Sequence, residues 1–226
     1  DGVPDPWTES ARKTSLAQSY DGSPATAPAS ATWIGYDDEA LYIAARHPVT
    51  NAASLVLTDH LWGATDAMEI ALQNSRAETP GPVLNLYGWP DGHFLSTDEA
   101  GAPAQVVDRL TKSVSYAAAV TDGEWTCEWR IPFAACGFTP ATAPALAMNM
   151  GVRKMAENAW VIWRGTGGAT HRVQDAGLLA FPAEVLAAGI PTENLAVRLD
   201  ASRAESLVLD DAGKVSLWKD TSGRDA

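Results

Sequence analysis

Hydrophobic and polar residues alternate along much of this chain, in short runs separated by turn residues. The clearest run is EWTCEWRIPF, which follows an Asp-Gly turn and ends at a proline. Its apolar face consists of Trp125, Cys127, Trp129 and Ile131, and its polar face of Thr126, Glu128 and Arg130. Successive side chains of a strand point to opposite faces, so this pattern predicts a strand with one buried side.

Other runs of the same kind predict further strands. They lie at residues 31–36, 40–46, 67–73, 83–89, 114–120, 145–155, 159–165 and 177–181. Many short strands between turn signals predict an all-β fold, specifically a two-sheet antiparallel β-sandwich of the jelly-roll or immunoglobulin-like type. AACG at 134–137 predicts a turn or a single helical turn stopped by Gly137. One short helix is predicted near the end, at residues 182–189, where Pro182 suits a first turn and Gly189 a C-cap.

The composition changes after this predicted helix. We therefore expect a sandwich domain over residues 1–190, followed by a linker and a partial module over residues 191–226. Within the tail, residues 211–213 predict a hairpin turn between two β-prone runs. The tail is too short to form its own core, so it either adds strands to the sandwich or begins a second domain.

Charge and composition narrow the ligand classes. The formal net charge is −12, and no cluster of Lys and Arg offsets it, so we expect no nucleic-acid partner. A neutral ligand, a cationic ligand or calcium fits this charge better. No apolar run is long enough to cross a membrane, so membrane insertion is not expected.

Tryptophan is the unusual residue of this chain, with nine copies. A tryptophan fills a core or meets a ligand, so we expect at least two to face outward. The β-patterned positions Trp7, Trp33, Trp125 and Trp129 are predicted to be core. The two cysteines, Cys127 and Cys136, are interpreted either as a disulfide or as two separate buried thiols, since their spacing matches no zinc motif.

A series of segments, taken in chain order, resembles the family 9 carbohydrate-binding modules and their relatives with a DOMON-type β-sandwich. The segments are DGVPDPW, YDDEALYIAARH, WGATDAME, GEWTCEWRIPFAACG, MNMGVRK, WVIW and DAGLLAF. They span about residues 1–181. LDAS and GKVSLWKDTSG in the tail are similar to the opening strands of concanavalin-like or laminin-G-like domains. These resemblances imply a longer, secreted, multidomain bacterial protein, extracellular or at the cell surface, whose partners are a polysaccharide or oligosaccharide and its own further domains.

The resemblance also implies a sugar site. In that family two tryptophans sandwich a terminal sugar, whose C–H patches stack on aromatic faces while polar groups bond its hydroxyls. Trp62 matches the first tryptophan. Glu69 matches the family's glutamate with one extra residue of spacing, and Asn85 matches its asparagine. Val83 stands where an arginine is expected, which puts the family's sugar specificity in doubt for this chain.

The second tryptophan of the pair is matched to Trp163, with Trp160 as its competitor. These two lie three residues apart on a predicted strand and so face opposite sides, one toward the core and one toward a ligand. Trp89, in the GWPDG turn, is either an additional platform or a turn residue that packs inward.

Three further readings follow from the residues. A structural calcium ion is considered, with Asp66 as the best single ligand; no organic cofactor is expected. A haem-binding electron-transfer domain is the main alternative, because four His and four Met could supply axial ligands, although no C-x-x-C-H motif occurs. The third is a ligand-free spacer, which buried Trp62 and Trp163 would indicate. No hydrolase or nucleotide-binding motif occurs, so the chain is predicted to be non-catalytic.

Overall fold

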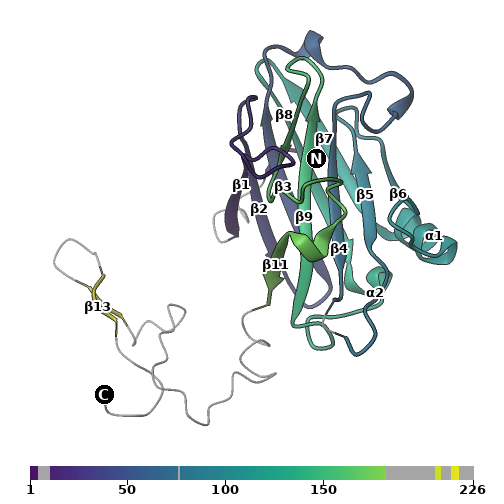
Figure 1. Cartoon of the computed structure of the whole chain (residues 1–226), viewed down its shortest axis with the longest axis vertical. Coiled ribbons are helices and arrows are strands. Elements are labelled where there is room, and N and C mark those ends of the chain that lie inside the picture. The colour runs from purple at the N-terminus through teal and green to yellow at the C-terminus, as the bar shows by residue number, and fades with distance from the viewer. Residues whose placement is uncertain (5–10, 76, 182–206, 210–214, 219–226) are drawn as a thin grey trace. The chain divides into compact units, whose positions relative to one another are not determined.

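A computed structural model describes residues 1–4, 11–75, 77–181, 207–209 and 215–218. The chain divides into two compact units, Asp1–Phe181 and Pro182–Ala226. The first unit is a β-sandwich of two antiparallel sheets (Figure 1). This confirms the predicted fold class.

The first sheet, called here the β3 sheet, has five strands in the order β1-β2-β3-β8-β7. Their bounds are Arg12–Leu16 (β1), Ser30–Tyr36 (β2), Ala40–Pro48 (β3), Glu124–Pro132 (β8) and Ser115–Thr121 (β7). The second, called the β9 sheet, has the order β10-β9-β4-β5-β6, and β11 also pairs with β9. Its strands are Ala159–Ile162 (β10), Ala145–Lys154 (β9), Ala67–Gln73 (β4), Leu84–Gly88 (β5), Phe94–Thr97 (β6) and Gly177–Ala180 (β11).

The core lies between the sheets and follows the period-two alternation. In β8 the predicted apolar face, with Trp125, Cys127 and Trp129, is fully or almost fully buried. Met68 and Ile70 of β4 enter the same core from the other sheet, which leaves Glu69 between them on the outer face. Both cysteines are free thiols and both are buried, so the second of the two interpretations holds.

One core prediction is wrong. Trp33 is only partly buried, because its neighbours Thr32 and Ile34 take the inward positions of β2. Trp33 instead lies on the outer face of the β3 sheet, where Lys13 and Arg46 approach its ring at 5.4 and 5.7 Å. Alternation shows that the two faces of a strand differ, but here both faces carry bulky residues, and the pattern does not say which is inside. Trp7 lies outside the described residues.

The helices differ from the prediction. Helix α1 (Ala104–Ser113) follows β6 and was not predicted, although its buried Val106 and Leu110 have helical spacing. The expected helical turn is α2 (Phe133–Cys136), ended by Gly137 at φ 79°. Short 3₁₀ turns span Ala52–Ser54 (η2), Thr58–His60 (η3) and Val173–Asp175 (η4). The helix expected at residues 182–189 lies outside the described residues, and no described helix is long and apolar enough to span a membrane.

The second unit contributes one described feature. Strands β12 (Leu207–Leu209) and β13 (Val215–Trp218) form an antiparallel pair, as expected for the predicted hairpin. The turn at 211–213 lies outside the described residues. The partial concanavalin-like or laminin-G-like module stays a prediction.

Candidate functional site

The outer face of the β9 sheet gathers the polar residues that the sequence singled out. Glu69 on β4 pairs across the ladder with Tyr87 on β5, and Ala71 pairs with Asn85 two residues further along β4. Although these residues face away from the core, Glu69 is 1% exposed and Asn85 is 0% exposed. The site therefore consists of strand residues that are buried on the outer face of the sheet.

Three buried oxygen atoms in this site have no hydrogen-bond partner among the described residues. Two of them can only accept, Oε1 of Glu69 and Oδ1 of Asn85, and the third is the hydroxyl of Thr170, which packs over Gly151 beside Glu69. Neighbouring groups bond to one another: Asn85 Nδ2 donates to the Tyr87 hydroxyl at 3.1 Å, and that hydroxyl donates to Glu99. A buried, unused acceptor costs about 1–3 kcal/mol and needs an explanation in a folded protein.

Two carboxylates, Glu69 and Glu99, contribute to the pKa shifts of the groups at this site. Burial, followed by the charge of Glu69, raises the pKa of the Tyr20 hydroxyl to about 12. The same two causes raise the pKa of Tyr87 further, with Glu99 adding to the effect. His171 lies 3.6 Å from Glu69 Oε1, and this contact raises the pKa of its imidazole. Groups from three separate segments thus respond to the same two carboxylates, Glu69 and Glu99.

A continuous aromatic surface borders the carboxylates, and we call it the aromatic row. It consists of Tyr87, Trp62, Trp160 and Tyr20. Trp62 stacks on Tyr87 with ring centroids 4.4 Å apart and an angle of 12° between the rings, and it meets the edge of Trp160 at 5.0 Å. Trp160 contacts Tyr20 at 5.4 Å. Trp62 and Trp160 are both partly exposed, so the row offers ring surface to solvent.

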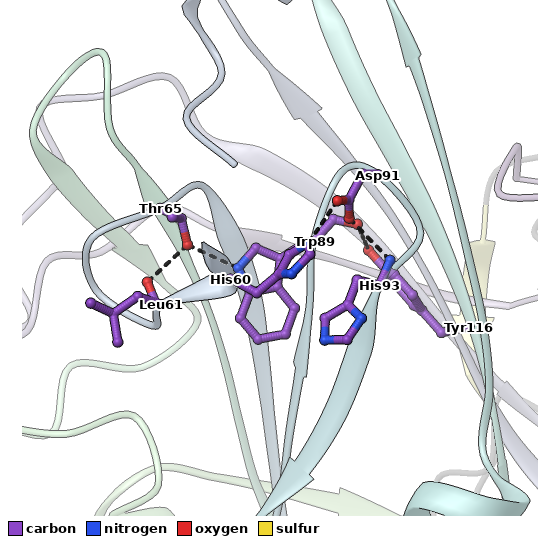
Figure 2. A network of polar contacts seen from close by, with 7 residues as sticks. All are labelled: His60, Leu61, Thr65, Trp89, Asp91, His93 and Tyr116. Atoms are coloured by element: carbon purple, nitrogen blue, oxygen red, sulfur yellow. Dashed lines mark hydrogen bonds and ion pairs between the residues drawn. The ribbon is translucent and has the colours of Figure 1, made fainter. Parts of the chain in front are cut away.

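A polar network holds the loop that carries Trp62 (Figure 2). The indole Nε1 of Trp89 donates to Thr65 Oγ1 at 2.9 Å, and Thr65 donates to the Leu61 carbonyl at 2.8 Å. Trp89 is anchored in turn from the β3 sheet, because the Tyr116 hydroxyl donates to its carbonyl at 2.8 Å. These bonds tie the 61–65 loop to the body of the sandwich and position Trp62.

Trp89 therefore cannot serve as a sugar platform. It is 0% exposed, and His60 and His93 cover its ring at centroid distances of 5.2 and 5.3 Å. Asp91 holds this cover in place by bonding His60 Nε2 at 2.6 Å and the His93 backbone N–H at 3.1 Å (Figure 2). The interpretation of Trp89 as a turn residue that packs inward is the correct one.

The expected pairing of Trp62 with Trp163 is also wrong. Trp163 packs against the main core cluster, and its ring lies directly over Gly177 of β11. Trp160 is the tryptophan that meets Trp62. Trp160 and Trp163 do face opposite sides, as predicted, but Trp160, the expected competitor, takes the outer position.

An open groove continues from Trp160. Its volume is about 360 Å³, and its lining combines polar and apolar surface. The lining residues are Ser19, Tyr20, Asp21, Ser23, Thr26, Asn158, Ala159 and Trp160. Trp160 and Tyr20 belong to both the groove and the aromatic row, so the two form one extended surface.

Asp66 has a role within the fold. Its Oδ2 accepts the Val56 N–H at 2.7 Å and its Oδ1 accepts the Met155 N–H at 3.0 Å. It thereby joins two loops beside β4. Among the described residues, no three His, Cys, Asp or Glu side chains come together as a metal site. A structural calcium ion at Asp66 stays a prediction.

Several site residues were not found from the sequence. Tyr87 could have been found, because it lies two residues after Asn85 and so shares its face of β5. Tyr20, Glu99 and His171 lie outside the site's predicted strands and motifs. They reach the site only through the folding of the chain. The methionines considered as haem ligands include Met148 and Met150, which are fully buried in the sandwich core.

The fold is shared with known carbohydrate-binding modules. A family 9 module from Caldicellulosiruptor kristjanssonii, solved with cellotriose, aligns with a TM-score of 0.59 at 16% identity, over 80% of this chain and 87% of that one. The same family 9 module solved with glucose gives 0.58 at 16% identity, over 80% and 88%. A Bacteroides uniformis protein gives 0.55 at 12% identity, over 76% and 87%. Neither a known protein family nor a curated protein matches the sequence itself.

Proposed function

We propose that this chain is a non-catalytic module that binds a saccharide on the outer face of the β9 sheet. The observation that carries the proposal is the pair of buried, unused acceptors, Glu69 Oε1 and Asn85 Oδ1, beside two partly exposed tryptophans, Trp62 and Trp160. The fold supports it, because the modules that share this fold were solved with glucose and cellotriose.

Recognition divides between the two kinds of surface. The C–H face of a sugar ring stacks on the aromatic row, as apolar patches do on indole rings. Hydroxyl groups of the same ring donate to Glu69 and Asn85, which use their free acceptors only when a ligand is present. The 360 Å³ groove beside Trp160 accepts the neighbouring sugar of a chain. The module thereby holds a larger, secreted protein on its glycan.

The test is a binding measurement on the isolated chain. Isothermal titration calorimetry with glucose, cellotriose and a panel of oligosaccharides should find at least one ligand. Trp62→Ala and Trp160→Ala should each weaken its binding by roughly tenfold or more, because a stacked ring contributes about 1–3 kcal/mol by analogy with nucleobase stacking.

Trp33→Ala is the matched control, since it removes another partly exposed tryptophan from the opposite sheet. The affinity of this variant for the saccharide should equal that of the unchanged protein. The proposal fails if no glycan of the panel binds, or if Trp33→Ala weakens binding as much as Trp62→Ala does.

A further inference from the structure

We propose that the saccharide selected by this site carries a positively charged amino group, which makes the ligand an amino sugar or an oligomer of one. This inference rests on the proposed function and specifies its ligand class. It is carried by the kind of polar atom that the site leaves unused, and by the charge that surrounds those atoms.

Two of the unused atoms can take part in a hydrogen bond in only one way, and both are acceptors. Glu69 Oε1 and Asn85 Oδ1 both lack a donor, and both belong to side chains that are at least nine-tenths buried. A neutral hydroxyl both donates and accepts, so a site built for a neutral sugar supplies donors as well. An ammonium group has three donors and no acceptor. The inventory of this site therefore complements an amine better than a hydroxyl.

The side-chain amide of Asn85 and part of the Arg153 guanidinium are already engaged, and the unpartnered Thr170 hydroxyl can accept as well as donate. Asn85 Nδ2 donates to Tyr87, and the Tyr87 hydroxyl donates to Glu99. Arg153 donates from Nε to the Gly63 carbonyl at 3.2 Å and from Nη2 to Asn158 Oδ1 at 2.6 Å. These two bonds fix the Arg153 guanidinium within the fold and use two of its five N–H groups.

The electrostatic surroundings favour the same ligand. The carboxylates of Glu69 and Glu99 act together on Tyr20, Tyr87 and His171. The His171 ring nitrogen lies 3.6 Å from Glu69 Oε1, within ion-pair distance but too far to donate a hydrogen bond, so a ligand ammonium can still donate to this oxygen beside His171. An ammonium that donates to a buried carboxylate forms a charge-assisted bond, roughly twice as strong as a neutral one.

The aromatic row accepts a cation as well as a sugar face. The guanidinium carbon of Arg153 already lies 5.2 Å from the centre of the Trp160 ring, within the range of a cation–π contact. A protonated amino sugar combines the two features that the site offers, since its ring C–H groups stack on indole while its ammonium reaches the carboxylates.

The experiment compares three sugars that differ at one carbon. Glucosamine, N-acetylglucosamine and glucose share the pyranose ring and carry an ammonium, a neutral amide and a hydroxyl at C2. Their trimers should be titrated into the chain by calorimetry at pH 6, where the amine is protonated. We expect the glucosamine trimer to bind at least about tenfold more tightly than the other two, with a preference that shrinks in about 0.5 M NaCl.

Charge-neutralising variants test which carboxylates cause the preference for the amine. Glu69→Gln should remove most of it, and Glu99→Gln, which changes an exposed carboxylate, should remove part of it. Glu124→Gln makes the same chemical change on β8 of the β3 sheet and should leave the preference intact. If Glu69→Gln does not fold, as judged by circular dichroism, Glu99→Gln carries the test.

The outcomes separate the two proposals. Equal or tighter binding of the cellotriose or N-acetylated trimer, still lost in Trp62→Ala, overturns the amino-sugar inference and leaves saccharide binding standing. An amine preference that is undiminished in Glu99→Gln, or that disappears in Glu124→Gln, also overturns it. Failure of all three trimers and of the wider panel overturns both.

Discussion

The two outer faces of the sandwich are built from the same kind of strands but differ in how their polar side chains are hydrogen-bonded. On the β3 sheet the charged groups have partners: Arg130 bonds Glu39 at 2.8 Å, and the Gly2 N–H donates to Glu128 at 3.3 Å. On the β9 sheet Glu69 and Asn85 are more deeply buried yet leave acceptors unused. A face that is satisfied by its own side chains needs no ligand, whereas a face with buried, unused acceptors is completed by one.

The contrast extends to the tryptophans. Trp33 on the β3 sheet and Trp62 beside the β9 sheet are both partly exposed. Trp33 is flanked by two cations, Lys13 and Arg46, whereas Trp62 is flanked by other rings. Exposure alone therefore does not identify a binding tryptophan, and its neighbours do.

The largest expected effect comes from the buried anchor beneath the β9 face. Trp89→Ala should lower the free energy of unfolding by about 3–5 kcal/mol, because it empties a fully buried indole site and leaves Thr65 without its donor. Trp33→Ala on the other face should cost less than about 1 kcal/mol. Urea unfolding followed by circular dichroism measures both, and similar losses for the two variants would contradict the roles given to them.

A smaller effect tests whether the unused acceptors are kept for binding rather than for stability. Asn85→Leu removes Oδ1, so the free energy of unfolding should stay within about 1 kcal/mol of the unchanged protein. Saccharide binding should fall sharply at the same time. Glu39→Ala, which breaks an exposed ion pair on the β3 sheet, should lower stability by up to about 1 kcal/mol and leave binding unchanged. Normal binding by Asn85→Leu would remove Asn85 from the site.

The smallest expected effect is a pH dependence. The contact with Glu69 raises the pKa of His171 above 6.5, so protonated His171 stabilises the folded state. This contribution is complete below pH 6.5 and is lost as the pH rises through the raised pKa. Burial lowers the pKa of His47, which has the opposite effect on stability. As the pH falls below 6.5, His47 is protonated in the unfolded chain before it is protonated in the folded one, so the free energy of unfolding decreases.

Histidine NMR titration separates these two groups. The resonance of His171 should titrate above pH 6.5 and return toward that value in Glu69→Gln, while His47 should stay neutral well below pH 6.5. Glu124→Gln should leave both unchanged. A His171 pKa that does not respond to Glu69→Gln would contradict the contact between the two side chains.

Some elements of the fold follow from local pattern and others do not. The inward face of β8 was predicted correctly, because alternation places Trp125, Cys127 and Trp129 on one side whatever the rest of the chain does. Helix α1 was missed, although Val106 and Leu110 have helical spacing, because ten residues with two buried positions resemble a loop. The inward side of β2 was mistaken, because Trp33 and Ile34 are both apolar enough to be core.

For the site, the sequence by itself determined that Glu69 and Asn85 lie on strands with one outward face and that Trp160 and Trp163 face opposite sides. Only the tertiary structure decided which tryptophan meets Trp62. That choice depends on β11, since Gly177 leaves room for the Trp163 ring against the core and so turns Trp160 outward. Tyr20, Glu99 and His171 joined the site through contacts between segments far apart in the chain, and alternation within one strand carries no information about such contacts.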